Sequence, residues 1–398
     1  MMPFLANKEE CTGCSACYNV CPKNCIQMIQ DEEGFLYPKI IGDCIGCKLC
    51  ESVCPKLNSP KIINNFIKSA YAACTKHFDI WKRSASGGAF SEICKVFGND
   101  STMVVGAAWD GFYVTHKTVV GVDNIKPLCK SKYIYSYVGH AYKNIKDYLQ
   151  KEQKVVFCGT PCQVAGLRNY LGNTYETQNI LTIDLVCHGV GSPAVFSACI
   201  KAMESQFCMQ IDSYEFRSKR NVFETDHITK ISSGSKYLYL SNDQYMQLFL
   251  NQDCLRPSCG KNCIYRNENR VGDITIADFK GLDEVFPCLC GEKKNFSTIV
   301  CNTSKGYSVV EKLKPEMVMY ECSVEDVKKY NPLFSRQTWY SEDRDKFFDE
   351  FKRDSTEAIL RFTKPATKYK RTICKKIYDF LPTFTRKFIK KTYKKIHK

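Results

Sequence analysis

The alternation of apolar and polar positions changes character near residue 70. From there on, short apolar or alternating runs predict strands at 70–75, 102–109, 112–120, 154–158 and 179–187. Helices are predicted between these strands at about 86–97, 161–171 and 194–207. The turn-forming pair Asp110-Gly111 separates two of the strands and favours a hairpin. The order strand, turn, helix, strand indicates an α/β sheet with some parallel pairing.

The two ends of the chain follow other patterns. Past residue 210 the runs are shorter and more antiparallel in character, with strands predicted at 212–217, 223–231 and 273–277. Before residue 57 the chain consists of cysteine blocks. We therefore predict a small domain at 1–57, a linker at 58–69, a larger mixed-sheet α+β or α/β domain at 70–355, and a tail at 356–398.

Cysteine is the residue that stands out in the composition. The 398 residues include 25 cysteines, nine of them within the first 54, whereas 44% hydrophobic and 25% charged residues are ordinary globular values. The first twelve residues lack the basic and apolar segments of a signal peptide, and no stretch approaches the roughly 18 apolar residues of a spanning helix. We therefore expect a cytoplasmic protein, in which grouped thiols serve metal binding or redox chemistry.

The first 54 residues contain an internal repeat of the pattern C-x2-C-x2-C-x3-C-P. This pattern resembles that of bacterial ferredoxins with two 4Fe–4S clusters, in which the fourth cysteine of each block binds the other cluster. The resemblance covers about residues 7–56. It assigns Cys11, Cys14, Cys17 and Cys54 to one cluster, and Cys44, Cys47, Cys50 and Cys21 to the other.

A pair of zinc sites is the alternative for these cysteines, because four-thiolate zinc sites also use C-x2-C. Zinc does not require the third cysteine at the same short spacing or the proline that follows each block. The clusters are therefore the favoured prediction. Cys25 lies outside the ligand set and is interpreted as a spare thiol.

Several strings in the larger domain carry a second resemblance. They are Ser131-Lys132-Tyr133, 157–167 (FCGTPCQVAGL), 184–190 (DLVCHGV), 254–259 (CLRPSC) and 272–279 (GDITIADF). Together they resemble the beta subunit family of coenzyme F420 hydrogenases and dehydrogenases, over about residues 70–351. The resemblance implies an FAD enzyme in which a flavin bridges one-electron clusters and a two-electron substrate or carrier.

The resemblance also directs attention to two strand-to-helix turns. Small residues just before a helix let backbone N–H groups approach a pyrophosphate, so the expected flavin contacts are Ser86, Gly87, Gly88, Gly159, Thr160 and Pro161. An ordinary turn is the alternative for each. The string at 277–281 (ADFKG) departs from the family, in which a Gly and a Trp are usual there, and its Asp278 is placed on the flavin side.

A second thiol group suggests a third 4Fe–4S cluster. By the family resemblance its ligands are expected to be Cys162, Cys254, Cys259 and Cys263, with Cys187 as the alternative fourth ligand to Cys162. Buried or zinc-binding cysteines are the other interpretations. Cys288, Cys290 and Cys301 receive no explanation from the sequence.

His188 follows a predicted strand and is a candidate proton donor to a reduced substrate. A structural, hydrogen-bonding histidine is the favoured interpretation, so the sequence leaves the catalytic residue unknown.

The net charge of +15 belongs almost entirely to the tail. From residue 361 to the end there are 14 Lys and Arg against one Asp, whereas the rest of the chain has 43 basic and 41 acidic residues. A global nucleic-acid binder is therefore not expected. Apolar residues at helical spacing among the lysines predict a basic amphipathic helix on an anionic membrane surface, at the inner membrane face. A solvated or disordered tail and RNA binding by the tail are the alternatives.

The expected function is an iron–sulfur flavoprotein oxidoreductase that is ferredoxin- or deazaflavin-linked. Low-potential electrons would enter at the small domain from a ferredoxin or another redox protein and reach FAD through the clusters, or move in the reverse direction. By the resemblance alone, the substrate is expected to belong to cell-surface polysaccharide synthesis. The alternative is a non-catalytic electron-transfer subunit that serves a partner enzyme.

Overall fold

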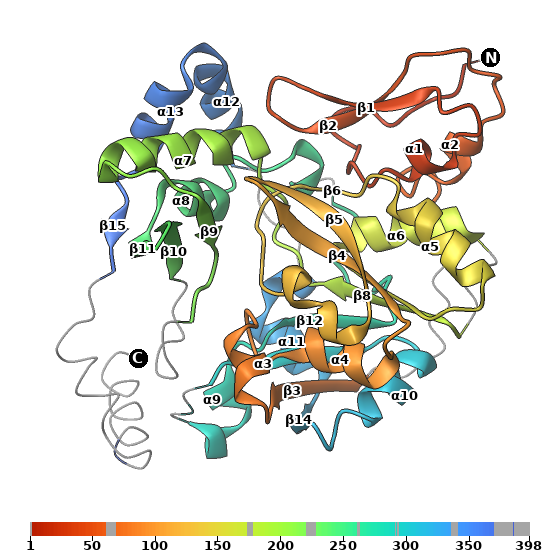
Figure 1. Cartoon of the computed structure of the whole chain (residues 1–398), viewed down its shortest axis with the longest axis vertical. Coiled ribbons are helices and arrows are strands. Elements are labelled where there is room, and N and C mark those ends of the chain that lie inside the picture. The colour runs from red at the N-terminus through yellow and green to blue at the C-terminus, as the bar shows by residue number, and fades with distance from the viewer. Residues whose placement is uncertain are drawn as a thin grey trace.

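The computed structural model of the chain describes residues 2–60, 69–172, 178–219, 228–260, 263–290, 292, 294–335, 341–369 and 385. Within these ranges the molecule combines a small cysteine-rich unit with a larger body built on a nine-stranded sheet (Figure 1). The small unit lies at one end of the body, next to the helices labelled α5 and α6.

The central sheet mixes parallel and antiparallel pairs. Its strand order is β14 (Met317–Cys322), β3 (Ser69–Thr75), β13 (Ser297–Cys301), β12 (Ile274–Asp278), β8 (Ile180–Leu185), β7 (Val155–Gly159), β4 (Met103–Asp110), β5 (Tyr113–Val120) and β6 (Ser136–Tyr137). Four neighbouring strands in the middle, β12, β8, β7 and β4, are parallel. The carboxyl ends of these strands therefore meet at one edge of the sheet.

The alternation of side chains along the middle strands explains why both faces of the sheet are covered. In β4, Val104 faces one apolar cluster while Met103 and Val105 face another. Helices α4 (Ala89–Phe97) and α10 (Ser304–Glu311) cover the first face, and α5 (Ala141–Gln150) and α6 (Pro161–Leu171) cover the second. Strands buried on both sides are continuous apolar runs, as the sequence shows for residues 155–157.

A second apolar core lies beside the sheet. It is formed by α7 (Pro193–Phe207), α8 (Gln244–Asn251), α12 (Arg344–Arg353) and α13 (Ser355–Phe362), which pack with a four-stranded sheet of β15 (Thr367–Lys368), β11 (Lys236–Asn242), β10 (Thr229–Ser233) and β9 (Ser213–Glu215). Short helices α3 (Phe78–Lys82), α9 (Leu282–Val285) and α11 (Val324–Tyr330) complete the body. Because Ala358 and Ile359 are fully buried and β15 pairs with β11, the body continues past the boundary predicted at residue 355.

The cysteine-rich unit consists of α1 (Ala16–Val20), α2 (Leu49–Ser52) and the antiparallel pair β1 (Ile26–Gln30) and β2 (Leu36–Ile40). Its α1 packs against α5 and α6 of the body. Buried Asn19 donates to the carbonyl of Gly139, 2.8 Å away, at this contact. The small unit is therefore docked on the body rather than held only by the chain that follows it.

The mixed α/β architecture with an N-terminal cysteine-rich domain confirms the predicted fold class. The predicted hairpin is the pair β4–β5, with Gly111 in the left-handed region at φ 59°. Helix α4 begins at Ala89, three residues later than predicted, because Gly88 adopts φ 96° and cannot be a helical residue. The predicted strand 223–231 is observed only as Thr229–Ser233, and residues 220–227 lie outside the described ranges.

The basic tail lies outside the described residues from 370 onward, apart from residue 385, as does most of the predicted linker at 58–69. In the part of the chain that the structure describes, no helix has both the length and the apolar character needed to cross a membrane.

Candidate functional site

The two cysteine blocks share a backbone conformation as well as a spacing. Gly13 and Gly46, which are equivalent in the repeat, have φ of 68° and 67°. Ser15 and Lys48, also equivalent, have φ of 64° and 59°, which side-chain-bearing residues rarely adopt. The repeated left-handed turns direct successive cysteine side chains of each block toward one cavity.

The first of these cavities, the inner cavity, has a volume of about 440 Å³. Its lining includes Cys11, Cys14, Cys17 and Cys54, three cysteines of the first block and the last cysteine of the second. This is the set that the ferredoxin resemblance assigns to one cluster. Cys14 approaches α6 closely, because a Cβ at Gly166 would lie 3.0 Å from the Cys14 sulfur.

The second cavity, the outer cavity, has a volume of about 330 Å³ and the complementary set. Cys21, Cys44, Cys47 and Cys50 line it together with Cys25. The Cys25 sulfur is buried and lies 3.4 Å from the sulfur of Cys21. Cys25, interpreted from the sequence as a spare thiol, is therefore a neighbour of the expected ligands.

A third cavity of about 570 Å³ lies between the small unit and the body. Its lining includes Cys162, Cys187, Cys259 and Cys263. Cys254, expected from the sequence as a ligand, is not part of this lining. It is fully buried in the apolar core with Cys199 and Tyr245, because the chain after α8 turns its side chain inward.

Polar atoms without partners also face the third cavity. They are the Nε and Nη1 of Arg266, the hydroxyl of Tyr265 and the hydroxyl of Ser258, all buried. Buried polar groups are normally hydrogen-bonded, so this group of orphaned donors indicates that the cavity receives a further acceptor. Four thiols and an arginine suit an anionic iron–sulfur cluster.

Local hydrogen bonds explain how Cys162 reaches the third cavity. Thr160 caps α6, and its Oγ1 donates to the Gln163 side chain at 2.9 Å while Gln163 accepts from the Thr160 N–H at 3.0 Å. The Thr160 hydroxyl also lies 3.1 Å from the Cys162 sulfur. The turn Gly159-Thr160-Pro161, expected from the sequence to contact a flavin, thus positions a cysteine of the third cavity.

A buried ion pair fixes the opposite wall of this cavity. Arg270 Nη2 lies 2.9 Å from Asp184, which also accepts from the N–H groups of Val271 and Gly272. Asp184 is the second-last residue of β8 and lies three residues before Cys187, and Arg270 follows Cys263. The pair therefore holds the two cysteine-bearing loops together.

The three cavities form a row. Cys50 lines both the outer and the inner cavity, and Thr12 lines both the inner and the third cavity. Thr12 also forms a side-chain hydrogen bond with Cys162. Neighbouring cavities of the row thus have one lining residue in common.

The environment keeps three thiols of the third cavity, those of Cys162, Cys187 and Cys259, neutral in the absence of a positive partner. Burial raises the pKa of Cys162, Cys187 and Cys259 to about 12 each. Iron is a partner that would stabilise the thiolate forms. Among the described residues, no three His, Cys, Asp or Glu side chains converge as ligands of one metal ion.

The other expected flavin contacts lie beside β3 and β13, which are separated from β7 by β12 and β8 in the sheet. A Cβ at Gly87 would lie 2.2 Å from the carbonyl oxygen of Ala73, and the Gly87 N–H donates to Ser297 Oγ at 2.9 Å. Ser86 donates to the carbonyl of Phe296 at 2.8 Å. Close packing on β3 and β13 therefore accounts for Ser86 and Gly87 without a ligand.

Two cationic side chains, Lys219 and Arg217, nevertheless lie near Ser86 and form the cationic group around Lys219. Lys219 is buried, and its Nζ donates to the carbonyls of Trp81 and Ser86 at 2.8 and 2.6 Å. Burial, together with nearby Arg217, lowers the pKa of Lys219 to about 7. Arg217 itself pairs with Asp278 at 2.6 Å. Asp278 thus neutralises an arginine rather than standing free.

His188 does not present a free acid. Its Nε2 lies 3.2 Å from the carbonyl of Phe249, and its ring packs on the Phe249 ring. Burial and the nearby Arg266 lower the pKa of His188 to about 4, so the ring is neutral at pH 7. The geometry gives His188 a contact with a backbone carbonyl and an aromatic ring.

Comparison with known proteins agrees with the thiol geometry. Residues 10–58 match the family of 4Fe–4S dicluster domains, and residues 152–327 match the C terminus of the coenzyme F420 hydrogenase/dehydrogenase beta subunit. This second match covers less than half of the chain, and over it the chain is similar to the beta subunit family. None of the curated proteins matches the chain.

Among solved structures, a chain of the F420-reducing NiFe hydrogenase complex from Methanosarcina barkeri is similar, with a TM-score of 0.46 and 13% identity. The similarity covers 76% of this chain and 92% of that chain. The combination of a dicluster domain and a beta-subunit domain identifies this chain as an iron–sulfur protein of the electron-transfer type.

The contact between the dicluster domain and the beta-subunit domain includes residues that the sequence did not single out. The turn between β1 and β2 inserts Phe35, which is fully buried in the core of the body. Glu33 on the same turn pairs with Arg344 on α12 and with Lys8. Glu33, Arg344 and Lys8 lie in no sequence motif, so the sequence carries no indication that they join the two domains.

Proposed function

We propose that this chain is an iron–sulfur flavoprotein oxidoreductase that passes electrons between three 4Fe–4S clusters and FAD. The observation that carries the proposal is the row of three thiol cavities in which Cys50 and Thr12 are the shared walls. We propose Cys162, Cys187, Cys259 and Cys263 as the ligands of the third cluster, in place of the set with Cys254. Carriers in a row of this kind transfer single electrons.

The outer cavity is the proposed entry point. Cys47 is exposed, whereas Cys11 and Cys14 of the inner cavity are buried against the body. A ferredoxin or another redox protein is the proposed partner at this end. The third cavity, enclosed by both domains, is the proposed exit toward the flavin.

The cationic group around Lys219 is the proposed place for the FAD diphosphate. Lys219 and Arg217 have protein partners there, whereas the Nε of Arg83 and the Nε1 of Trp81 are buried without hydrogen-bond partners. Donors and a helix N-terminus at Ala89 suit a diphosphate. Bound FAD would supply the exchange between single electrons and electron pairs.

The chemistry of the substrate rests on the family resemblance alone. We propose a two-electron carrier such as a deazaflavin, or a precursor of a cell-surface polysaccharide. We also propose that the basic tail holds the protein at an anionic membrane surface, because its lysines flank apolar residues.

Iron and flavin analysis of the anaerobically purified full chain tests the proposal. About 12 irons per chain with a flavin spectrum are expected, since each of three clusters holds four irons. About 8 irons would refute the third cluster. Clusters without bound or reconstitutable flavin would refute the enzyme and favour the relay subunit that serves a partner.

A further inference from the structure

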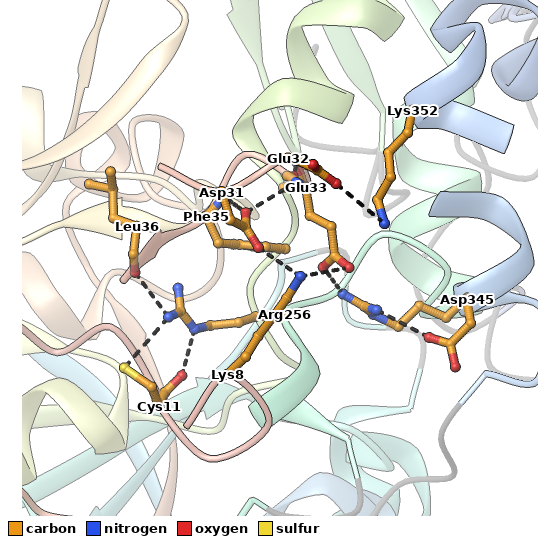
Figure 2. Close-up of polar contacts among 12 residues, drawn as sticks. Lys8, Cys11, Asp31, Glu32, Glu33, Phe35, Leu36, Arg256, Asp345 and Lys352 are labelled. Carbon is orange, nitrogen blue, oxygen red and sulfur yellow. Dashed lines mark hydrogen bonds and ion pairs between the residues drawn. The ribbon is translucent and has the colours of Figure 1, made fainter. Parts of the chain in front are cut away.

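Arg256 is a buried cation without a carboxylate partner. It is 1% exposed, and its hydrogen bonds go to the carbonyls of Cys11 and Leu36, at 2.7 and 3.0 Å (Figure 2). Its Nη1 has no partner. Among the described residues, no Asp or Glu forms an ion pair with this guanidinium, which stays protonated at any working pH.

Three other arginines that are buried or nearly so are compensated, whereas buried Arg266 lines the third cavity with its Nε and Nη1 unpartnered. Arg270 pairs with Asp184, Arg344 with Glu33, and Arg217 with Asp278. Figure 2 shows the contrast within one view, because Lys8 is surrounded by Asp31 and Glu33 whereas Arg256 points to Cys11. A buried charge is stable only when it is paired, so Arg256, which has no carboxylate partner, requires another anion beside it.

The nearest sulfur provides that anion when iron is bound. Arg256 Nη2 lies 3.7 Å from the sulfur of Cys11, one of the four cysteines of the inner cavity. Three aromatic rings, of Tyr37, Tyr135 and Phe35, surround the guanidinium at 4.1 to 5.4 Å and exclude water from it. Its charge is therefore directed at the inner cavity and is weakly screened.

The same residue connects the inner and third cavities through its backbone. Its carbonyl accepts from the N–H of Cys259 at 2.9 Å, and its N–H donates to the carbonyl of Val190 at 3.0 Å. A Cβ at Gly13 would lie 2.9 Å from Arg256 Nη1, so the cluster-binding loop is shaped around the guanidinium. The site of Arg256 is thus built from both domains.

We propose that Arg256 is a positioning residue that raises the reduction potential of the inner cluster by placing an uncompensated positive charge beside the Cys11 thiolate. This inference rests on the proposed function, because it requires a cluster in the inner cavity. Adding an electron makes a cluster more negative, so a nearby fixed cation stabilises the reduced form. Burial of the cluster away from water disfavours the more negative reduced form and so lowers the reduction potential. The arginine offsets this lowering and keeps the inner cluster able to accept electrons from the outer one.

The test is a redox titration of the anaerobically prepared full-length protein, followed by electron paramagnetic resonance, with iron counted in each variant. Arg256→Gln is expected to lower the equilibrium constant for reduction of one cluster about tenfold, which corresponds to about 59 mV for a one-electron couple. Arg256→Lys keeps the charge and loses the Nε hydrogen bond to Cys11, so it is expected to stay within about threefold of wild type.

Lys8→Gln is the matched control. It removes a positive charge from the same region, but this charge is paired with Asp31 and Glu33 and is half-exposed. Its effect on the equilibrium constants for reduction of the clusters is expected to be less than about twofold, because surface pairs are well screened.

Three results would overturn the inference: unchanged potentials in Arg256→Gln with wild-type iron content, a shift in Lys8→Gln as large as in Arg256→Gln, or a tenfold shift in Arg256→Lys. A tenfold shift in Arg256→Lys refutes the inference even if Arg256→Gln fails to bind iron. An iron-free wild-type protein would instead refute the proposed function itself, so the two failures are distinguishable.

Discussion

The identity of the third-cluster ligands gives the sharpest prediction, because the sequence and the structure select different cysteines. The structure replaces Cys254 by Cys187 in the proposed ligand set. Two single substitutions, Cys187→Ala and Cys254→Ala, separate these choices. Both residues are buried or partly buried thiols, and each substitution removes one sulfur atom.

We expect Cys187→Ala to lose iron. The wild-type protein should hold about 12 irons per chain, and the variant should fall toward about 8 as the third cluster is lost. The protein should still fold, because the buried Asp184–Arg270 pair that supports this region is untouched. The remaining clusters should keep their absorbance.

We expect Cys254→Ala to keep its iron and lose stability. Cys254 is fully buried in the core, so truncation to Ala leaves a small cavity that costs about 1 kcal/mol. The assay is colorimetric iron and sulfide analysis of anaerobically purified protein, together with thermal unfolding. Iron loss in Cys254→Ala with full iron in Cys187→Ala would refute the assignment and restore the ligand set expected from the sequence.

Three further predictions concern the domain contact, the flavin and the tail. Arg344→Ala leaves buried Glu33 with only Lys8, and should cost roughly 3 kcal/mol of unfolding free energy, measured by thermal or denaturant unfolding; an unchanged stability would contradict the role of this pair. Lys219→Met should weaken FAD binding at least tenfold. Since the pKa of Lys219 is lowered to about 7 and a diphosphate favours the ammonium, wild-type FAD affinity should fall as pH rises above 7, by at most about tenfold per pH unit, while the variant shows no such fall in a fluorescence titration. Deletion of residues 370–398 should abolish sedimentation with anionic liposomes at low salt and leave the iron content unchanged; full retention on liposomes would exclude the tail as the anchor.

The fold of the larger domain was predictable to a useful degree. Strands such as β3 and β7, and the helices α6 and α7, lie within a few residues of their predicted positions, because apolar runs and turn residues are local signals. The start of α4 and the end of the body near β15 were predicted less well. Both depend on how the chain packs, since Gly88 ends the loop in a left-handed conformation and β15 is held by β11.

The turns expected to hold a flavin show a different kind of difference. Gly87 is small because β3 and β13 leave it no room, and Gly159-Thr160-Pro161 positions Cys162. A glycine-rich strand-to-helix turn has the same sequence whether it approaches a ligand or another strand. The cationic group around Lys219, which no motif marks, is the structural feature that supports flavin binding at this end of the sheet.

The sequence by itself determined the two thiol sets of the small domain. In each block, three cysteines with two residues between neighbours lie on one loop, so their convergence depends only on local backbone turns. The resemblance to bacterial ferredoxins implies the exchange of the fourth ligand. Tertiary structure alone decided which distant cysteines share the third cavity and what charge lies beside the inner one. Cys187 and Arg256 reach their places through strand register, the Asp184 network and the docking of two domains. Those contacts join residues far apart in the chain, and no spacing in the sequence encodes them.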